Sequence, residues 1–461
     1  MEKYKDQKGG DKLKEIFESY KKLKTRDDYK HFTRNRKIAE GKTTEVFYPE
    51  IVKRVKLEHL GMINERDEIR SYVYSNGSLS STSARFQDMI VGNNILQDIS
   101  KVYSEKAADK EPIIKSNNDE WINKFDIADT VSELVFSSSY GGAILMKGVY
   151  SDDKFSYYAI KRNGFFEIYN PYNPQLIDGF VVFSQLEEEE DKLLLEIYHE
   201  GRTEYRAVSI KDDTWEEIAY PYELEGMKAD GKGYINEYEG WQVGYIRAYS
   251  DYNNDLVSNV REIVIQDTTT SQSFSKCLSP ILQVPESLIE YDNNGNGVVR
   301  VDDGIITVRK EDKDIKQIQL QTNVAEWNVQ RKNIFDNIYK STKTNENVFG
   351  LSANGSENAS GTSKERSMES LISVVRNKRN KCYRALEAVL KWGYNQEMNG
   401  ALEIVIEGTD VLEISEKEKL ENQALEIQNL ITLDKYLGDS EIQNALKDIK
   451  AELLGKFGIV K

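Results

Sequence analysis

The sequence predicts an α+β fold in which long amphipathic helices surround and follow a β-rich region. Apolar residues recur at helical spacing in several stretches, and the longest of these covers 363–394. Between about 143 and 250, short runs of Tyr, Phe, Ile and Val alternate with Asp, Asn, Gly and Pro, which is typical of antiparallel strands. A polar segment rich in Asn, Ser and Gly, 341–362, separates two of the helices. A chain of 461 residues has room for two or three domains.

The N-terminal part, up to about residue 110, is expected to be mainly helical. The helix predicted over 12–24 has one apolar stripe, formed by Leu13, Ile16, Phe17, Tyr20 and Leu23. A second helix is predicted over 119–134. The glycine pair Gly141-Gly142 then breaks the helix or lets two elements approach closely.

Six short strands are expected in the β-rich region, at 155–160, 165–169, 179–183, 193–198, 205–210 and 215–219. The acidic run Glu187–Asp191 is expected to be a solvated connection, because a strand face would not hold five successive charges.

The C-terminal half is expected to alternate helices with short irregular segments. In order, the pattern predicts a helix over 251–276, short strands with hairpin turns over 278–320, a helix over 324–340, a loop over 341–362, a helix over 363–394, a strand over 402–407 and a helical tail from 415. The loop has too few apolar side chains to order itself alone.

Charge is unevenly distributed along the chain. The net charge is −16, yet residues 1–56 carry 17 Lys and Arg against 10 Asp and Glu, so the remainder is −23. An acidic body is a poor wrapper of nucleic acid, because tight binding needs many contacts from Lys and Arg to phosphate. It suits a surface that DNA slides past, and general solubility explains it equally well.

Targeting and redox signals are weak. No apolar run approaches the ~18 residues of a membrane span, and the first ten residues lack the apolar core of a signal peptide. Cys277 and Cys382 stand alone, which favours a reducing cytoplasm over a disulfide framework or a zinc site.

Three motifs suggest chemistry but lack required residues. Gly41-Lys42-Thr43-Thr44 resembles the end of a phosphate-binding loop, but Arg36 stands where that loop needs glycine. Ser273-Phe-Ser-Lys276 lacks its partner motifs. The stretch 292–303 matches most ligand positions of a calcium loop, although a hairpin turn explains it more simply.

No catalytic, metal or cofactor site is expected. The three histidines, His31, His59 and His199, are isolated, and no recognisable catalytic constellation occurs in the sequence. The sequence therefore favours a structural or conduit protein over an enzyme.

From residue 120 onward, the order of elements resembles the phage portal family of the Gram-positive siphophage and myophage type. The most specific piece is Asn358-Ala-Ser-Gly361 before a long amphipathic helix, although Thr362-Ser-Lys364 replaces the usual small apolar residues. The tail stretch 429–452 and the segment Tyr140-Gly-Gly-Ala-Ile-Leu145 are also similar to portal sequences.

The resemblance implies a portal fold with a β-rich wing, a helical stem, a small αβ clip, a long helix and a helical crown. The implied regions are a helical N-terminal wing region (1–118), a β-rich wing (119–250), a stem helix (251–276), the clip (277–322), a second stem helix (323–340), a tunnel loop (341–362), the long helix with a wing strand (363–414) and the crown (415–461).

The resemblance further implies a head–tail connector in the virion, assembled in the host cytoplasm as a closed ring, typically a dodecamer, through which double-stranded DNA passes without sequence preference. An exposed apolar face on the stem helices would drive ring assembly. The implied partners are the large terminase, a head–tail adaptor, and the major capsid and scaffolding proteins, with no membrane. The implied DNA-channel residues are Lys340, Lys343, Asn345, Asn347, Asn354, Ser356, Asn358 and Ser360. The implied partner-facing clip residues are Arg309, Lys310, Lys313 and Lys316.

A different class of protein is also compatible with the sequence. The many tyrosines between 150 and 250 permit a tail baseplate component or a surface glycan-binding protein. Such a module would not need the polar loop followed by a long helix.

Overall fold

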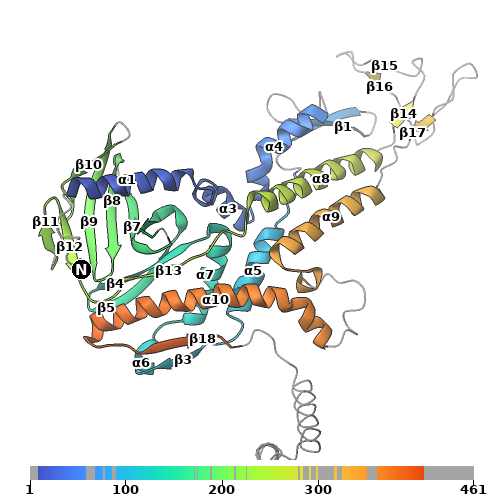
Figure 1. The fold of residues 1–461 in the computed structure, drawn as a ribbon. Coiled ribbons are helices and arrows are strands. Elements are labelled where there is room, and N and C mark those ends of the chain that lie inside the picture. Colours follow the sequence, from blue (N-terminus) through green and yellow to red (C-terminus); the bar gives the residue numbers. More distant parts are fainter. Residues whose placement is uncertain are drawn as a thin grey trace, which may run out of the picture.

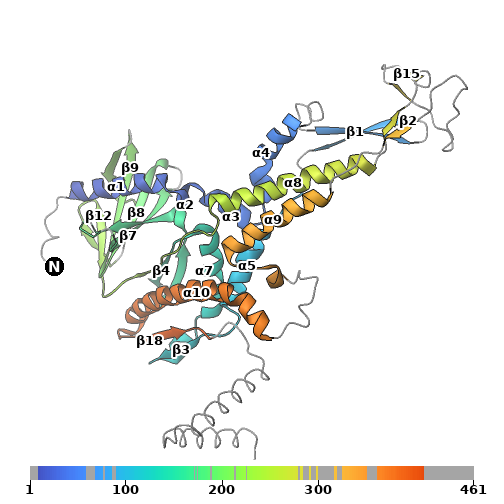
Figure 2. The ribbon, with the colours of Figure 1, turned by 45° about the vertical axis from the view of Figure 1, so that its right-hand side comes forward.

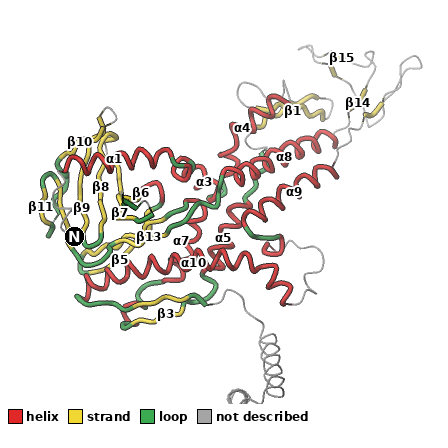
Figure 3. The backbone as a smooth tube through the Cα atoms, viewed as in Figure 1, coloured by secondary structure: helices red, strands yellow, loops and turns green. Residues whose placement is uncertain are grey.

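The computed structural model of the chain is a mixed α+β structure of helices and antiparallel sheets, so the predicted fold class is confirmed (Figures 1 and 3). It describes residues 9–409, apart from 59–67, 76–77, 86–89, 171, 174, 187–188, 212–213, 225, 279–280, 284–289, 292–296, 299–315, 319–323 and 350–360.

The largest sheet has seven antiparallel strands in the order β11-β12-β9-β8-β7-β6, with β10 also paired to β9. The strands are β6 (Phe165–Tyr169), β7 (Ile177–Leu186), β8 (Glu189–His199), β9 (Arg202–Lys211), β10 (Thr214–Ile218), β11 (Lys228–Asp230) and β12 (Gly233–Glu237). The five strands expected between 165 and 219 are confirmed. The prediction of a connection over the acidic run was wrong in part, because Glu189–Asp191 belong to β8. These residues begin β8, next to the turn of the β7–β8 hairpin, and Asp191 is exposed there.

Helix α1 (Gly9–Thr25) lies across one face of this sheet (Figure 1). Its buried side chains are those of the predicted apolar stripe, Ile16, Phe17, Tyr20 and Leu23. The ring centroids of Phe17 and Trp215 are 5.0 Å apart, and those of Tyr20 and Phe183 are 5.2 Å apart. The helical period of the sequence therefore marks the face that covers the sheet.

A three-stranded sheet, β13-β4-β5, joins the large sheet to the helices. Its strands are β4 (Ile144–Ser151), β5 (Lys154–Ile160) and β13 (Val243–Ile246). Leu145 packs in a cluster with Phe165 and Phe180 of the large sheet, whereas Ile144 and Met146 belong to the helical core. Because successive side chains point to opposite faces, β4 is buried on both sides, and its sequence does not alternate.

The main core is built around the long helix α10 (Gly361–Met398), which confirms the helix predicted over 363–394. Other elements that contribute to this core include α3 (Phe32–Ala39), α4 (Thr43–Glu58), α5 (Ile95–Ala107), α6 (Asp119–Ile122), α7 (Ile127–Gly141), β3 (Ile113–Ser116) and β18 (Ile404–Glu407). Strand β13 approaches α10 so closely that a Cβ on Gly244 would lie 2.0 Å from the Ala385 carbonyl oxygen. Only glycine allows this contact.

The helix expected over 119–134 is two helices, α6 and α7. The Asp126 side chain accepts a hydrogen bond from the Asp129 backbone N–H at 2.9 Å, and this cap starts a new helix. Helix α7 ends at the glycine pair, as predicted. Gly142 has a φ of +78°, and a Cβ there would lie 3.1 Å from the backbone nitrogen of Ser250.

Helices α8 (Asn254–Leu278) and α9 (Val324–Thr342) run side by side away from the core (Figures 1 and 2). They confirm the helices expected over 251–276 and 324–340. In the sequence, two short strand pairs separate the helices: β14 (Ile281–Gln283) with β17 (Lys316–Ile318), and β15 (Glu290–Tyr291) with β16 (Gly297–Val298). The β15–β16 pairing flanks the expected hairpin turn, whereas 292–296 and 299–303 lie outside the described residues.

The expectation of a mainly helical N-terminal part was wrong for 68–85. These residues form the antiparallel hairpin β1 (Glu68–Ser75) and β2 (Ser78–Arg85). The sequence does carry a signal for it, because Asn76-Gly77 is a favoured hairpin dipeptide between two runs of strand length.

A buried ion network connects the N-terminal segment to both sheets. Arg162, in the short helix η2 (Arg162–Gly164), is fully buried and donates two hydrogen bonds to the Glu167 carboxylate, at 3.0 and 3.1 Å. Its Nε donates to Asp28 of α2 (Asp27–Lys30) at 2.9 Å. Tyr245 of β13 donates to Glu167 at 2.7 Å, and the burial and the carboxylate raise the pKa of Tyr245. Every member of the network has at least one partner, as buried charges require.

We expect Arg162→Ala to lower the free energy of unfolding by about 3 kcal/mol, because the buried Glu167 carboxylate then keeps only the partly exposed Arg26, at 3.4 Å, as its counter-charge. Urea unfolding, followed by tryptophan fluorescence, measures this change. The matched control is Lys211→Ala, which breaks an exposed ion pair with Glu216 at 3.1 Å and should cost less than about 1 kcal/mol. Equal effects of the two substitutions would contradict the structural role of the network.

Candidate functional site

The α8–α9 pair is fixed along one side of α9. Arg331 donates to the Asp267 carboxylate of α8 through Nε at 3.1 Å and Nη2 at 3.4 Å. Its guanidinium also lies over the rings of Trp327 and Phe335, with centroid distances of 5.5 and 4.9 Å. Both rings belong to α9 and orient the guanidinium, so that its ion pair with Asp267 holds α9 against α8.

The other side of α9 is polar. Its exposed side chains include Glu326, Asn328, Gln330, Lys332, Asn333, Asn337 and Lys340. Among the described side chains of α8 and α9, Val329 is the one large apolar side chain that is exposed, at 61%. The prediction of an exposed apolar face on these two helices was therefore wrong for the described side chains. Apolar side chains of α8 such as Val260 and Ile263 are buried in the main core, which includes residues of α4 and α5.

Helix α9 ends in a Schellman motif without glycine. Lys343 has a φ of +54°, in the left-handed region that favours glycine. The Thr344 backbone N–H donates to the Tyr339 carbonyl at 3.0 Å, and the Lys343 N–H donates to the Lys340 carbonyl at 3.4 Å. These two bonds turn the chain sharply out of the helix.

The first residues of the expected loop are held on the core. Thr342 still belongs to α9, and its carbonyl accepts a hydrogen bond from the buried Tyr103 hydroxyl. The short helix η4 (Glu346–Phe349) follows, and Phe349 stacks on Tyr339 with ring centroids 6.0 Å apart. The expectation of a loop without packing side chains from 341 was therefore wrong for 341–349.

Three of the predicted channel residues lie together at the end of α9. Lys340 and Lys343 are exposed, whereas Asn345 is half-buried and its side-chain oxygen accepts a hydrogen bond from the Val348 N–H at 3.2 Å. Asn347 lies in η4. The remaining predicted channel residues lie outside the described residues: Asn354, Ser356, Asn358 and Ser360.

The predicted clip residues are barely covered by the structure. Lys316 lies in β17, and Arg309, Lys310 and Lys313 lie outside the described residues. Their roles stay predictions.

The segments that resemble chemical motifs have structural roles where the structure describes them. Gly41, with a φ of +79°, lies in the turn between α3 and α4, so a helix precedes it where a phosphate-binding loop needs a strand.

Burial raises the pKa of the Cys382 thiol to about 12. Within the described ranges, no group of His, Cys, Asp and Glu could hold a metal ion, and no helix is long and apolar enough to cross a membrane.

The chain matches no known family model and no curated protein. Its structure is similar to a chain in the virion of a native gene transfer agent particle, with 9% identity and a TM-score of 0.42. It is also similar to a chain in the neck of an empty particle of that kind, with 10% identity and a TM-score of 0.35. Each comparison covers 77% of this chain and 90% of the other. Because both TM-scores lie below 0.5, neither likeness establishes a common fold or function.

The left-handed Lys343 gives a test of how α9 ends. We expect Lys343→Gly to raise the free energy of unfolding by up to about 1 kcal/mol, because glycine adopts this conformation without a steric cost. The matched control, Lys340→Gly, changes the same residue type inside the helix and should lower stability by about 1 kcal/mol. Urea unfolding of both variants measures the difference, and equal losses would show that the Schellman motif does not form.

Proposed function

We propose that this chain is a portal-like subunit, which forms a closed ring around a channel for double-stranded DNA at a vertex of a viral capsid. In this proposal the seven-stranded sheet with α1 belongs to the wing, α8 and α9 form the stem, and the segment between them in the sequence forms the clip. The segment after α9 is the tunnel loop, α10 is the long helix, and 415–461 forms the crown.

The observation that carries the proposal is the path of the chain from α8 to α10. Helix α8 leaves the core, α9 returns beside it, the short helix η4 follows the end of α9, and the chain re-enters the core as α10 (Figure 2). One subunit thereby offers a distal segment at the tip of the helix pair and a second segment at its base. A ring channel needs these two levels, one for a docking partner and one for contact with DNA.

The exposed side chains at the base of the pair suit weak contact with DNA. Amide side chains dominate the open face of α9, and Lys340 and Lys343 stand where the chain leaves the helix. Neutral polar groups make exchangeable phosphate contacts, whereas many lysines would hold the duplex in place. At the distal end, Arg309, Lys310, Lys313 and Lys316 would face the terminase and later the adaptor, and the capsid and scaffolding proteins would surround the wing.

Glycan binding has less support from the described residues. The tyrosines at one end of the large sheet pack edge-to-face, with Tyr220 at 6.2 Å from both Tyr205 and Tyr222 and at 6.0 Å from Tyr234. Rings packed in this way contact one another. A sugar platform needs an open, flat ring face, and of these four tyrosines only Tyr222, 52% exposed, could offer one.

Electron microscopy of the purified full-length chain tests the proposal directly. We expect closed rings with a central hole, because a single subunit of this size can encircle a duplex only through cyclic symmetry. A particle that stays monomeric at micromolar concentration in moderate salt would contradict the portal assignment.

A shortened loop tests the channel role. We expect deletion of Leu351–Glu357 to leave ring assembly intact, because the anchoring contacts of Phe349 and the whole of α10 are kept. DNA packaging or retention should fall several-fold, since the segment would no longer reach the channel axis. An assembled ring that packages and retains DNA normally would reduce the segment to a passive linker.

A further inference from the structure

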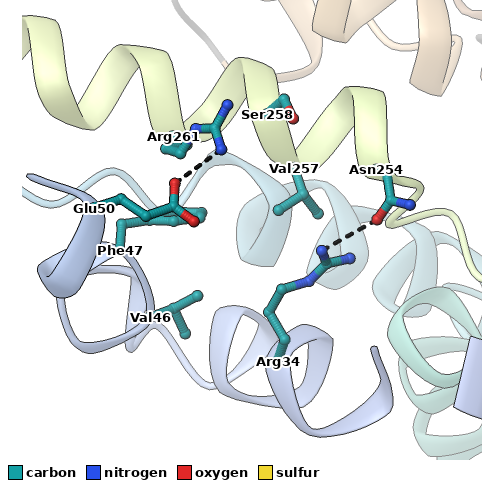
Figure 4. Close-up of a pocket in the computed structure, with 8 residues that line it drawn as sticks. All are labelled: Arg34, Val46, Phe47, Glu50, Asn254, Val257, Ser258 and Arg261. Atoms are coloured by element: carbon teal, nitrogen blue, oxygen red, sulfur yellow. Dashed lines mark hydrogen bonds and ion pairs between the residues drawn. The ribbon is translucent and has the colours of Figure 1, made fainter. Parts of the chain in front are cut away.

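A small hollow lies between α3, α4 and the first turns of α8 (Figure 4). Its volume is about 240 Å³, and it is lined by Arg34, Val46, Phe47, Glu50, Asn254, Val257, Ser258 and Arg261. Sites for small molecules and cofactors usually measure about 300–1,000 Å³. This hollow is therefore better matched to one protein side chain than to a free ligand.

The two arginines of the hollow are compensated differently. Arg261 donates to the Glu50 carboxylate at 2.8 Å across one side of the hollow. On the other side, the side chain of Arg34 donates only to neutral amide oxygens within the described part of the chain, that of Asn254 at 3.1 Å and that of Asn35 at 2.9 and 3.1 Å. Figure 4 shows Arg34 and Asn254 at one end of the hollow and Arg261 with Glu50 at the other.

Burial lowers the pKa of Arg34 below its ordinary value, although Glu50 and Asp27 act in the opposite direction. Among the described residues, these two carboxylates do not fully offset the cost of removing this guanidinium from water. A carboxylate placed beside it would offset more of that cost, and the pair would be stronger than an exposed one because it is partly shielded from solvent.

The distribution of charge points to the source of that carboxylate. Helices α3 and α4 lie mostly within the basic stretch 1–56, whereas the rest of the chain has a net charge of −23. In a cyclic ring, one face of each subunit meets a different face of the next, so complementary charges on a single chain favour the contact.

We propose that this hollow receives an acidic side chain from a second copy of the chain. Its carboxylate pairs with Arg34 at the rim, and its methylene groups pack on Val46, the half-buried apolar side chain of the lining. The inference rests on the proposed ring and assigns the α3–α4–α8 surface to the contact between neighbouring subunits.

The test compares the assembly of three variants by sedimentation velocity over a range of concentrations. Arg34→Gln should raise the concentration needed for half-assembly about tenfold or more, because a shielded charge pair is lost at each contact. Arg34→Lys keeps the charge and should fall between Arg34→Gln and the wild type. Added salt should weaken the assembly of the wild-type chain more than that of Arg34→Gln.

The matched control is Arg36→Gln, on the same helix. Arg36 is 55% exposed and pairs with Glu40 at 2.8 Å, so its loss should change assembly little. Circular dichroism and urea unfolding check that each variant is folded. If the wild type forms rings and Arg34→Gln assembles equally well, the inference fails while the proposed function stands. Equal losses in the Arg34 and Arg36 variants would also overturn it, and a monomeric wild type would overturn the ring itself.

Discussion

The burial of one guanidinium connects the N-terminal helices of this molecule to its large sheet and its three-stranded sheet. Arg162 has no exposed side chain, so the carboxylates of Asp28 and Glu167 must both stay within hydrogen-bond distance of it. Asp28 belongs to the N-terminal helices, Glu167 to the large sheet, and Tyr245, which also binds Glu167, to the three-stranded sheet. The network therefore holds the N-terminal helices, the large sheet and the three-stranded sheet against one another.

The three-stranded sheet carries this arrangement into the core. Strand β4 is buried on both faces, and Lys147 extends from it to Glu196 of the large sheet at 2.6 Å. Glu196 raises the pKa of Lys147, while burial acts to lower it, so the lysine stays charged within a mostly buried pair. On the other side, Gly244 lets β13 lie against the backbone of α10. The large sheet, the small sheet and the long helix are thus coupled by direct contacts.

The proposed ring would build on this coupled body. The α8–α9 pair extends from it, and the Asp267–Arg331 contact holds the pair together. The buried apolar face of α8 also bears on how copies associate. Among the described residues the chain itself covers that face, so the proposed contact between copies uses another surface, the polar and charged hollow beside Arg34.

The sequence by itself determined the helices α1, α8, α9 and α10 and the strands from β5 to β10, because helical and strand periods are local properties that the apolar residues display directly. It also placed the end of α7 at its glycine pair. It did not reveal that Arg162 pairs with Asp28, since the two residues are 134 positions apart and no local pattern encodes such a pairing. Nor did it show where α9 ends, because Lys343 adopts a left-handed conformation that its side chain does not favour. Only the tertiary structure decided these points, through hydrogen bonds and the stacking of Phe349 on Tyr339, which outweigh the local preferences of the chain.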